Sequence, residues 1–120
     1  MSRAAKSLLV FAIYLMGLSL ILLAVPNALL QPFGLDPTSE VWIRVVGMLV
    51  ACLAVYYLVA VTNELTVLIR ASVYVRSLVI VFFGVFVALG WAKPPLIMFG
   101  AVDLAAAAWT FLALRADARG

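Results

Sequence analysis

The feature that most constrains this sequence is a set of four long apolar runs with almost no charge, at roughly residues 5–30, 40–61, 71–90 and 95–114. A helix of about 20 apolar residues spans the hydrocarbon core of a bilayer. Lipid offers backbone groups no hydrogen bonds, so only helices and closed barrels can span it. The runs lack the alternation of a barrel strand. We therefore predict an all-α membrane protein: an antiparallel bundle of four transmembrane helices, with residues 1–120 as one integral membrane domain.

Composition supports this prediction and narrows the chemistry. The chain is 68% hydrophobic and 11% charged, whereas a soluble domain is about half apolar and about a quarter charged. The net charge of +3 comes from scattered basic residues, which form no stripe for nucleic acid. With no histidine and one cysteine, we predict no metal site, no cofactor and no dithiol chemistry. Cys52 is expected to be a small buried apolar residue.

The connections between the runs are short. Residues 31–40 hold prolines, a glycine and acids, which predicts a solvated loop. Residues 62–70 mix polar and apolar side chains, and we expect them to lie in the membrane interface. Residues 91–95 predict a tight turn. The chain has no charge over residues 7–35, well beyond the core of a signal peptide, so we predict a retained first helix.

Lysine and arginine are distributed unequally between the two ends of the predicted bundle. If the four helices alternate in direction, five basic residues share one end: Arg3, Lys6, Arg70, Arg115 and Arg119. Lys93 and Arg44 lie toward the other end. The richer end normally faces the cytoplasm. We therefore predict a multi-pass protein of the inner (plasma) membrane with both termini in the cytoplasm.

Three charged residues, Asp103, Arg44 and Arg76, lie inside the apolar runs. A carboxylate at such a depth costs about 2.5–3.5 kcal/mol unless it has a partner or a wet cavity. From the outer surface, Arg44 lies about one turn deep and Asp103 about two turns, so we expect these two to pair. Arg76 approaches from the inner surface, about three turns from Asp103, and is the second choice. We expect Arg76 to extend toward the cytoplasmic phosphates instead.

Small residues share the helix faces of these charges at the 3.6-residue period. The pairs are Arg44 with Gly47, Arg76 with Gly84, and Asp103 with Gly100. Glycine allows another helix to approach closely, so the charges are expected to face protein. An Asp103–Arg44 pair would be either a structural clamp or the polar part of a ligand pocket, and the clamp is slightly favoured.

A second group of polar residues is predicted near the inner surface. Tyr56 and Tyr57 lie in the inner half of the second run, and Glu64 follows it. These three could line a polar mouth of the bundle. The alternative is that the tyrosines lie in the interface with solvated hydroxyls, and this alternative is favoured.

The whole chain resembles the DoxX-like family of small four-helix integral membrane proteins, including its BphX-like members. The resemblance rests on the segments PFGLDPTSEVWIRVVGMLVACLAVYYLVA, SVYVRSLVIVFF and GAVDLAAAAWTFLALR. It implies a largely uncharacterised group, some of whose members accompany thiosulfate–quinone or other redox enzymes. Carried over, Arg44, Arg76 and Asp103 would be its recurring polar positions. The paired cysteines of some redox-linked relatives are missing here.

Three functions follow from these patterns. The first is an accessory or scaffold component of a membrane complex, or a homo-oligomer formed through small-residue faces. The second is a binder or carrier of a small hydrophobic or quinone-like molecule in a pocket around Asp103 and Arg44. The third is an enzyme, for which Asp103 is the only general acid or base available inside the membrane. We expect the first function and no catalytic residue.

Overall fold

The computed structural model describes residues 1–32, 34–35 and 37–119. Phe33 and Asp36 of the predicted 31–40 loop therefore lie outside the described residues. The described chain is helical and contains no strand. Its elements are α1 (Arg3–Ala24), α2 (Pro26–Leu30), α3 (Trp42–Thr62), α4 (Thr66–Ala88) and α5 (Leu96–Ala118). The prediction of an all-helical fold is confirmed for these residues.

Four of the helices, α1, α3, α4 and α5, are long and apolar enough to cross a membrane. They contain 21–23 residues each, which at a rise of about 1.5 Å per residue gives a length of about 30 Å. This length matches the hydrocarbon thickness of a bilayer. The four apolar runs of the sequence thus become four helices of membrane-spanning length.

Several helix boundaries differ from the predicted ones, and two of the differences affect the site. Helix α5 also ends at Ala118, four residues beyond the predicted end. The run expected at residues 5–30 divides into α1 and α2, because Pro26 has no N–H to continue the helix and instead occupies the first turn of α2. The third run begins at Thr66, not at residue 71. Residues 66–70, expected in an interface segment, are therefore the first turn of α4, and Arg76 lies deeper along its helix than the sequence suggested.

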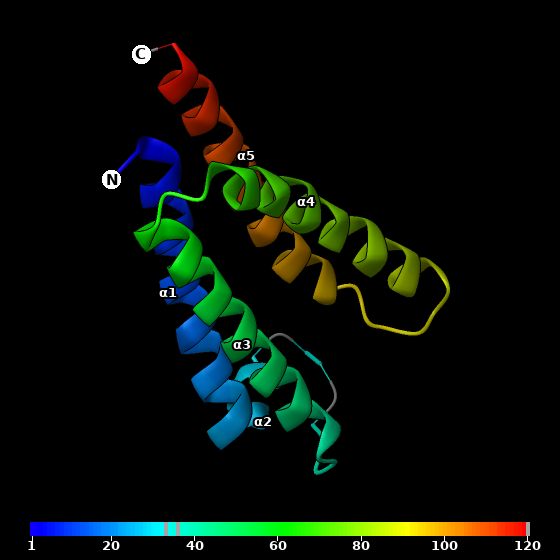
Figure 1. The fold of residues 1–120 in the computed structure, drawn as a ribbon. Helices are drawn as coiled ribbons and strands as arrows, with labels where there is room; N and C mark the ends of the chain where they lie inside the picture. The colour runs from blue at the N-terminus through cyan, green and yellow to red at the C-terminus, as the bar shows by residue number, and fades with distance from the viewer. Residues whose placement is uncertain (33, 36, 120) are drawn as a thin grey trace.

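The long helices form two pairs. Helix α3 packs along α1, α5 packs along α4, and contacts between α1 and α5 join the pairs. Helices α3 and α4 touch only slightly, although they are consecutive in the chain. Figure 1 shows that the two pairs meet near the N-terminus and diverge away from it. Side chains from both pairs line a cavity between them.

Glycines allow close approach within each pair. A Cβ on Gly47 of α3 would lie 2.9 Å from the Cβ of Leu22 in α1, and a Cβ on Gly100 of α5 would lie 2.9 Å from the Cα of Ile80 in α4. Real Cβ atoms do not tolerate such distances, so only glycine fits. The expectation that these glycines meet other helices is confirmed for Gly47 and Gly100, but not for Gly84, where a Cβ would have no atom within 4 Å.

Backbone N–H groups of α1 hold the converging end together. The N–H groups of Arg3 and Ala4 donate to the Asp117 carboxylate at 3.2 and 3.1 Å, and the Ser2 N–H donates to Glu64 Oε1 at 2.7 Å. The first N–H groups of a helix have no partner within that helix, so acidic side chains are suited to this position. The start of α1, the end of α3, the start of α4 and the end of α5 thus lie together, at what we call the termini end.

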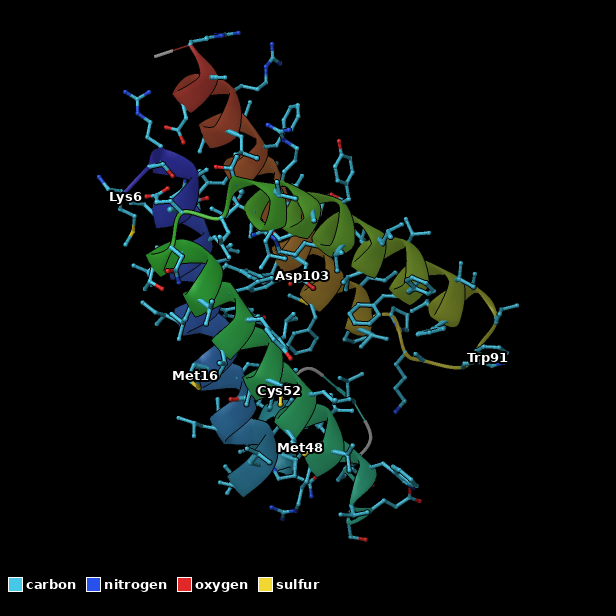
Figure 2. All side chains as sticks on the ribbon, in the orientation of Figure 1. Lys6, Met16, Met48, Cys52, Trp91 and Asp103 are labelled. Carbon is cyan, nitrogen blue, oxygen red and sulfur yellow. The ribbon has the colours of Figure 1, made fainter. Side chains whose placement is uncertain are left out.

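Cys52 corrects one prediction from the sequence. It is exposed on α3 and is not buried. Ala54 and Tyr57, on the opposite side of the same helix, face α1 and are buried instead. Figure 2 shows Cys52 on α3 and Asp103 in the region between the helix pairs. In a bilayer the exposed face of α3 would meet lipid, where a thiol is tolerated as a small apolar group.

Candidate functional site

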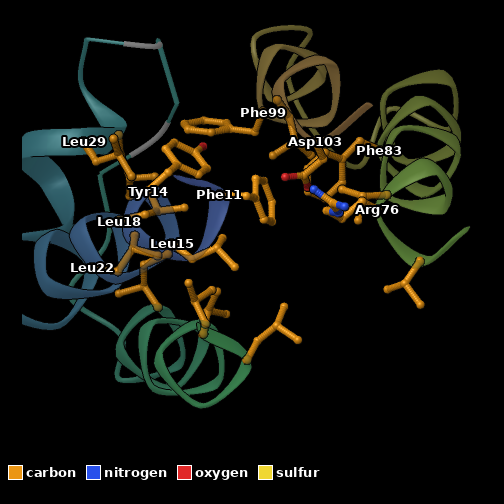
Figure 3. A pocket seen from close by; sticks show the side chains of 18 of the residues that line it. Phe11, Tyr14, Leu15, Leu18, Leu22, Leu29, Arg76, Phe83, Phe99 and Asp103 are labelled. Carbon is orange, nitrogen blue, oxygen red and sulfur yellow. The ribbon is translucent and has the colours of Figure 1, made fainter. Parts of the chain in front are cut away.

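The space between the helix pairs is a cavity of about 320 Å³. Its walls are apolar over most of their area, and Figure 3 shows side chains converging on it from α1, α4 and α5. The aliphatic part of the lining includes Leu15, Leu18, Leu22, Leu29, Ile43, Val46, Val50, Leu53 and Val79. The polar groups among the lining residues are the side chains of Arg76, Asp103, Tyr14 and Tyr57. A mostly apolar cavity with a few polar groups is the usual form of a small-molecule site.

Arg76 is the most unusual of these residues, because its side chain is only 2% exposed. Its Nε donates to the Ser72 carbonyl oxygen at 3.2 Å, and its Nη2 donates to Ser72 Oγ at 3.1 Å. Its Cζ lies 4.8 Å from the centre of the Phe11 ring. The third nitrogen, Nη1, is buried and has no hydrogen-bond partner among the described residues. An unsatisfied buried donor costs about 1–3 kcal/mol, and more when it is charged.

Asp103 faces Arg76 across the wall of the cavity (Figure 3). The register of α4 on α5 places them together: Gly100 lies against Ile80, and Arg76 and Asp103 are each about one turn from that contact. They are close enough to interact electrostatically but form no direct salt bridge. The carboxylate also accepts no hydrogen bond from any described residue. A charged hydrogen-bond donor and a charged acceptor thus line one cavity without bonding to each other.

Aromatic rings complete the wall beside Arg76. The Phe11 ring lies 6.0 Å from the Tyr57 ring and 5.7 Å from the Tyr14 ring, measured between centroids. Tyr57 is only 3% exposed, and all three line the cavity. Tilted aromatic contacts of this kind stabilise packing. They hold a rigid surface against which a flat apolar molecule could lie.

Arg44 does not pair with Asp103, contrary to the prediction from the sequence. Its Nη1 donates to the carbonyl oxygen of Leu23, in the last turn of α1, and its side chain does not line the cavity. Pro26 interrupts the helix, and the carbonyl groups of a helix's last turn attract basic side chains. Arg44 therefore stabilises the end of α1. The expected extension of Arg76 to the interface is also wrong, since its guanidinium is buried.

The three residues of the predicted inner polar mouth lie in three different environments. Tyr57 lines the cavity, whereas Tyr56 points outward and is 67% exposed. Glu64 lies in the α3–α4 turn, with φ of +50°, and binds the start of α1. The Ser2 backbone N–H that donates to Glu64 lowers the pKa of its carboxyl. Glu64 therefore belongs to the polar contacts of the termini end.

A second apolar groove, of about 480 Å³, lies behind the cavity between α1 and α5. It shares four lining residues with the cavity, namely Tyr14, Leu18, Leu29 and Phe99. Gly17 also lines it, and a Cβ at Gly17 would have no atom within 4 Å. A thin layer of side chains thus separates the cavity from a groove on another face of the protein.

Sequence reasoning missed Phe11, Tyr14 and Ser72 as site residues. Phe11 and Tyr14 are aromatic residues of an uncharged helix, and no local signal separates them from ordinary core residues. Ser72 did carry a signal, because it lies four residues before Arg76, within reach on the same helix face.

The charges and aromatic rings of the cavity suit binding better than catalysis. Nη1 of Arg76 can donate to a carbonyl or hydroxyl oxygen, Asp103 can accept from a hydroxyl, and Phe11 and the tyrosines can pack on a ring. Among the described residues, no cluster of cysteine, aspartate and glutamate side chains is able to hold a metal ion. In comparisons with known proteins, no family model, no curated protein and no solved structure matches this chain.

Proposed function

We propose that this chain is an integral membrane protein that binds a small, mostly apolar molecule in the cavity between its helix pairs. The single observation that carries the proposal is that Arg76 and Asp103 line the same cavity, while the buried Nη1 of Arg76 has no hydrogen-bond partner among the described residues. Ionisable groups at membrane depth are rare and mark functional sites. A structural clamp would join the two charges directly, whereas here they lie side by side unjoined.

The chemistry of the lining defines the ligand class. A carbonyl oxygen would accept from Arg76 Nη1, a hydroxyl could also donate to Asp103, and a ring would contact Phe11. A quinone has the ring and the carbonyl oxygens, and its reduced quinol form has the hydroxyl groups. The accessory or scaffold role expected from the sequence has no comparable observation in its favour, so we rank it second.

We expect the protein to lie in a membrane and the ligand to enter it from the lipid. Four helices of membrane-spanning length have exposed apolar faces. The basic residues predicted at one end favour a cytoplasmic position for the termini end under the positive-inside rule. The groove between α1 and α5 would open to lipid. We infer that an apolar ligand passes from the bilayer into this groove and then past Tyr14 and Phe99 into the cavity. Membership of the DoxX-like family remains part of this proposal.

Two variants of α4 test the cavity. Val79 lines the cavity, whereas Val81 is 58% exposed and lies outside it. Val79→Phe fills the site, and Val81→Phe adds the same ring to the lipid-facing surface. Organic extracts of the purified wild type and both variants are compared by mass spectrometry. We expect one co-purifying small molecule in the wild type and in Val81→Phe, and its loss from Val79→Phe.

Two probes of the same shape test the polar contact. Menadione has carbonyl oxygens, and methylnaphthalene has the same fused rings without them. A hydrogen bond to a charged group contributes about 1.5–3 kcal/mol, so we expect menadione to bind roughly tenfold to a hundredfold more tightly. Arg76→Met should abolish this difference, and Arg115→Gln, which removes an arginine outside the cavity, should keep it. Equal binding of both probes, or unchanged binding in Val79→Phe, would favour the scaffold role.

A further inference from the structure

A basic groove lies between the start of α4 and the end of α5. It has a volume of about 190 Å³ and shares no lining residue with the cavity. Arg70 and Tyr74 of α4 line it together with Phe111, Leu114 and Arg115 of α5. Figure 1 shows the first turns of α4 beside the later part of α5. Two guanidinium groups from separate helices thus line one groove, and none of its described lining residues is acidic.

Both arginines lack an acidic partner among the described residues. The one salt bridge within those residues joins the amino group of Met1 to Glu64. The Cζ of Arg115 lies 5.8 Å from the centre of the Phe111 ring, and neither guanidinium of the groove donates to a described residue. Two like charges lining a groove repel each other, and an anion between them would remove this repulsion. Guanidinium groups bind phosphate strongly because their N–H groups match its oxygens in pairs.

The position of the groove indicates where the anion comes from. Arg70 is four residues from the start of α4 at Thr66, and Arg115 is three residues from the end of α5 at Ala118. Each is therefore about 4.5–6 Å from its helix end. In a helix that spans the hydrocarbon core, this position is close to the level where head groups meet acyl chains. Val73, Phe111 and Leu114 continue the groove with apolar side chains. A soluble phosphate would use only the arginines, whereas a phospholipid would use both parts.

We propose that this groove binds an anionic phospholipid, with its phosphate between Arg70 and Arg115 and an acyl chain against the apolar side chains. Basic pockets between membrane helices on the cytoplasmic side bind anionic head groups in this way. The proposal rests on insertion of the protein into a membrane and is independent of what the cavity binds. The lipid would join α4 to α5 near the termini end.

The test compares lipids bound to the full chain by native mass spectrometry. Protein in nanodiscs of mixed phosphatidylglycerol and phosphatidylcholine, with the same acyl chains, is released and its retained lipids are counted. We expect retention of phosphatidylglycerol over phosphatidylcholine in the wild type. Arg70→Gln and Arg115→Gln should each lower this preference about fivefold, because each basic side chain contributes a similar factor near an anionic surface. Arg115→Lys should retain most of the preference.

Arg119→Gln is the matched control, because it removes one positive charge from the same end but outside the groove. If it lowers the preference as much as Arg115→Gln does, general surface charge explains the binding and the proposal is overturned. If inorganic phosphate at millimolar concentration displaces the lipid, the groove is an anion site without lipid specificity, and the proposal fails. Failure of the protein to insert into nanodiscs would instead refute the proposed function. Menadione binding that persists after the lipid preference is lost would refute neither.

Discussion

Gly100 offers the sharpest test of how the two charges come together. It is the point of closest approach between α4 and α5, because a Cβ there would lie 2.9 Å from the Cα of Ile80 and 3.2 Å from its Cβ. The first of these atoms is backbone and cannot move without moving α4. Gly100→Ala should therefore push α4 away from α5 along the stretch that carries Arg76 and Asp103.

The expected loss of stability in Gly100→Ala follows from comparison with a second glycine, Gly84. Overpacking of this kind costs about 1–3 kcal/mol, while replacing a helical glycine with alanine gains about 0.5–1 kcal/mol. A Cβ on Gly84, which is in α4, would meet no atom within 4 Å. Gly84→Ala should therefore gain the stability of a helical alanine without the cost of overpacking. The difference in unfolding free energy between the two variants should equal the clash alone, about 1–3 kcal/mol.

The assay is reversible unfolding in mixed micelles of a mild detergent and sodium dodecyl sulfate, followed by far-ultraviolet circular dichroism. We expect Gly100→Ala to be the less stable of the two variants, and its menadione affinity to fall because Asp103 lies less than one turn away. If the two variants are equally stable to within about 0.5 kcal/mol, α4 and α5 do not approach as closely as described. The register that brings Arg76 to Asp103 would then be wrong.

The remaining predictions concern access to the cavity and the termini end. Gly17→Phe should fill the groove between α1 and α5 and slow the association of menadione in stopped-flow fluorescence. Gly84→Phe, at another glycine with open space around it, should leave the association rate unchanged. Equal rates in the two variants would refute the proposed entry of the ligand through this groove. The Glu64 carboxyl should titrate below its ordinary pKa in carbon NMR, because the Ser2 N–H donates to it. Since the folded-state pKa is lowered, the contact stabilises the fold above the ordinary pKa and is lost as the pH falls through the folded-state pKa. Ser2→Pro, which removes the N–H, should raise the pKa more than Ser2→Ala, which keeps it, and the reverse order would contradict the assignment.

The depth of Arg76 shows how an error in one predicted helix boundary affected the predicted site. Counting from an expected start at residue 71 placed Arg76 near the interface, within reach of phosphates. Helix α4 begins five residues earlier, at Thr66, and Ile69 in this added stretch is buried. Arg76 thus lies about 15 Å along its helix. Its burial against Phe11 follows from that shift, and only the folded chain showed it.

The sequence by itself determined the helices and the set of charged residues inside them. Apolar runs of this length form helices because each helix satisfies its own backbone hydrogen bonds, and this property is local. The sequence also identified Asp103 as a carboxylate inside an apolar run, where it needs a partner or a wet cavity. Which arginine meets Asp103 is not a local property, because it depends on which helices are neighbours. Arg44 is on α3, which packs along α1, whereas Arg76 is on α4, which packs along α5 beside Asp103. The tertiary structure alone decided which arginine is the neighbour of Asp103, because the Gly100 contact sets the register of α4 on α5 and places Arg76 and Asp103 on the wall of one cavity.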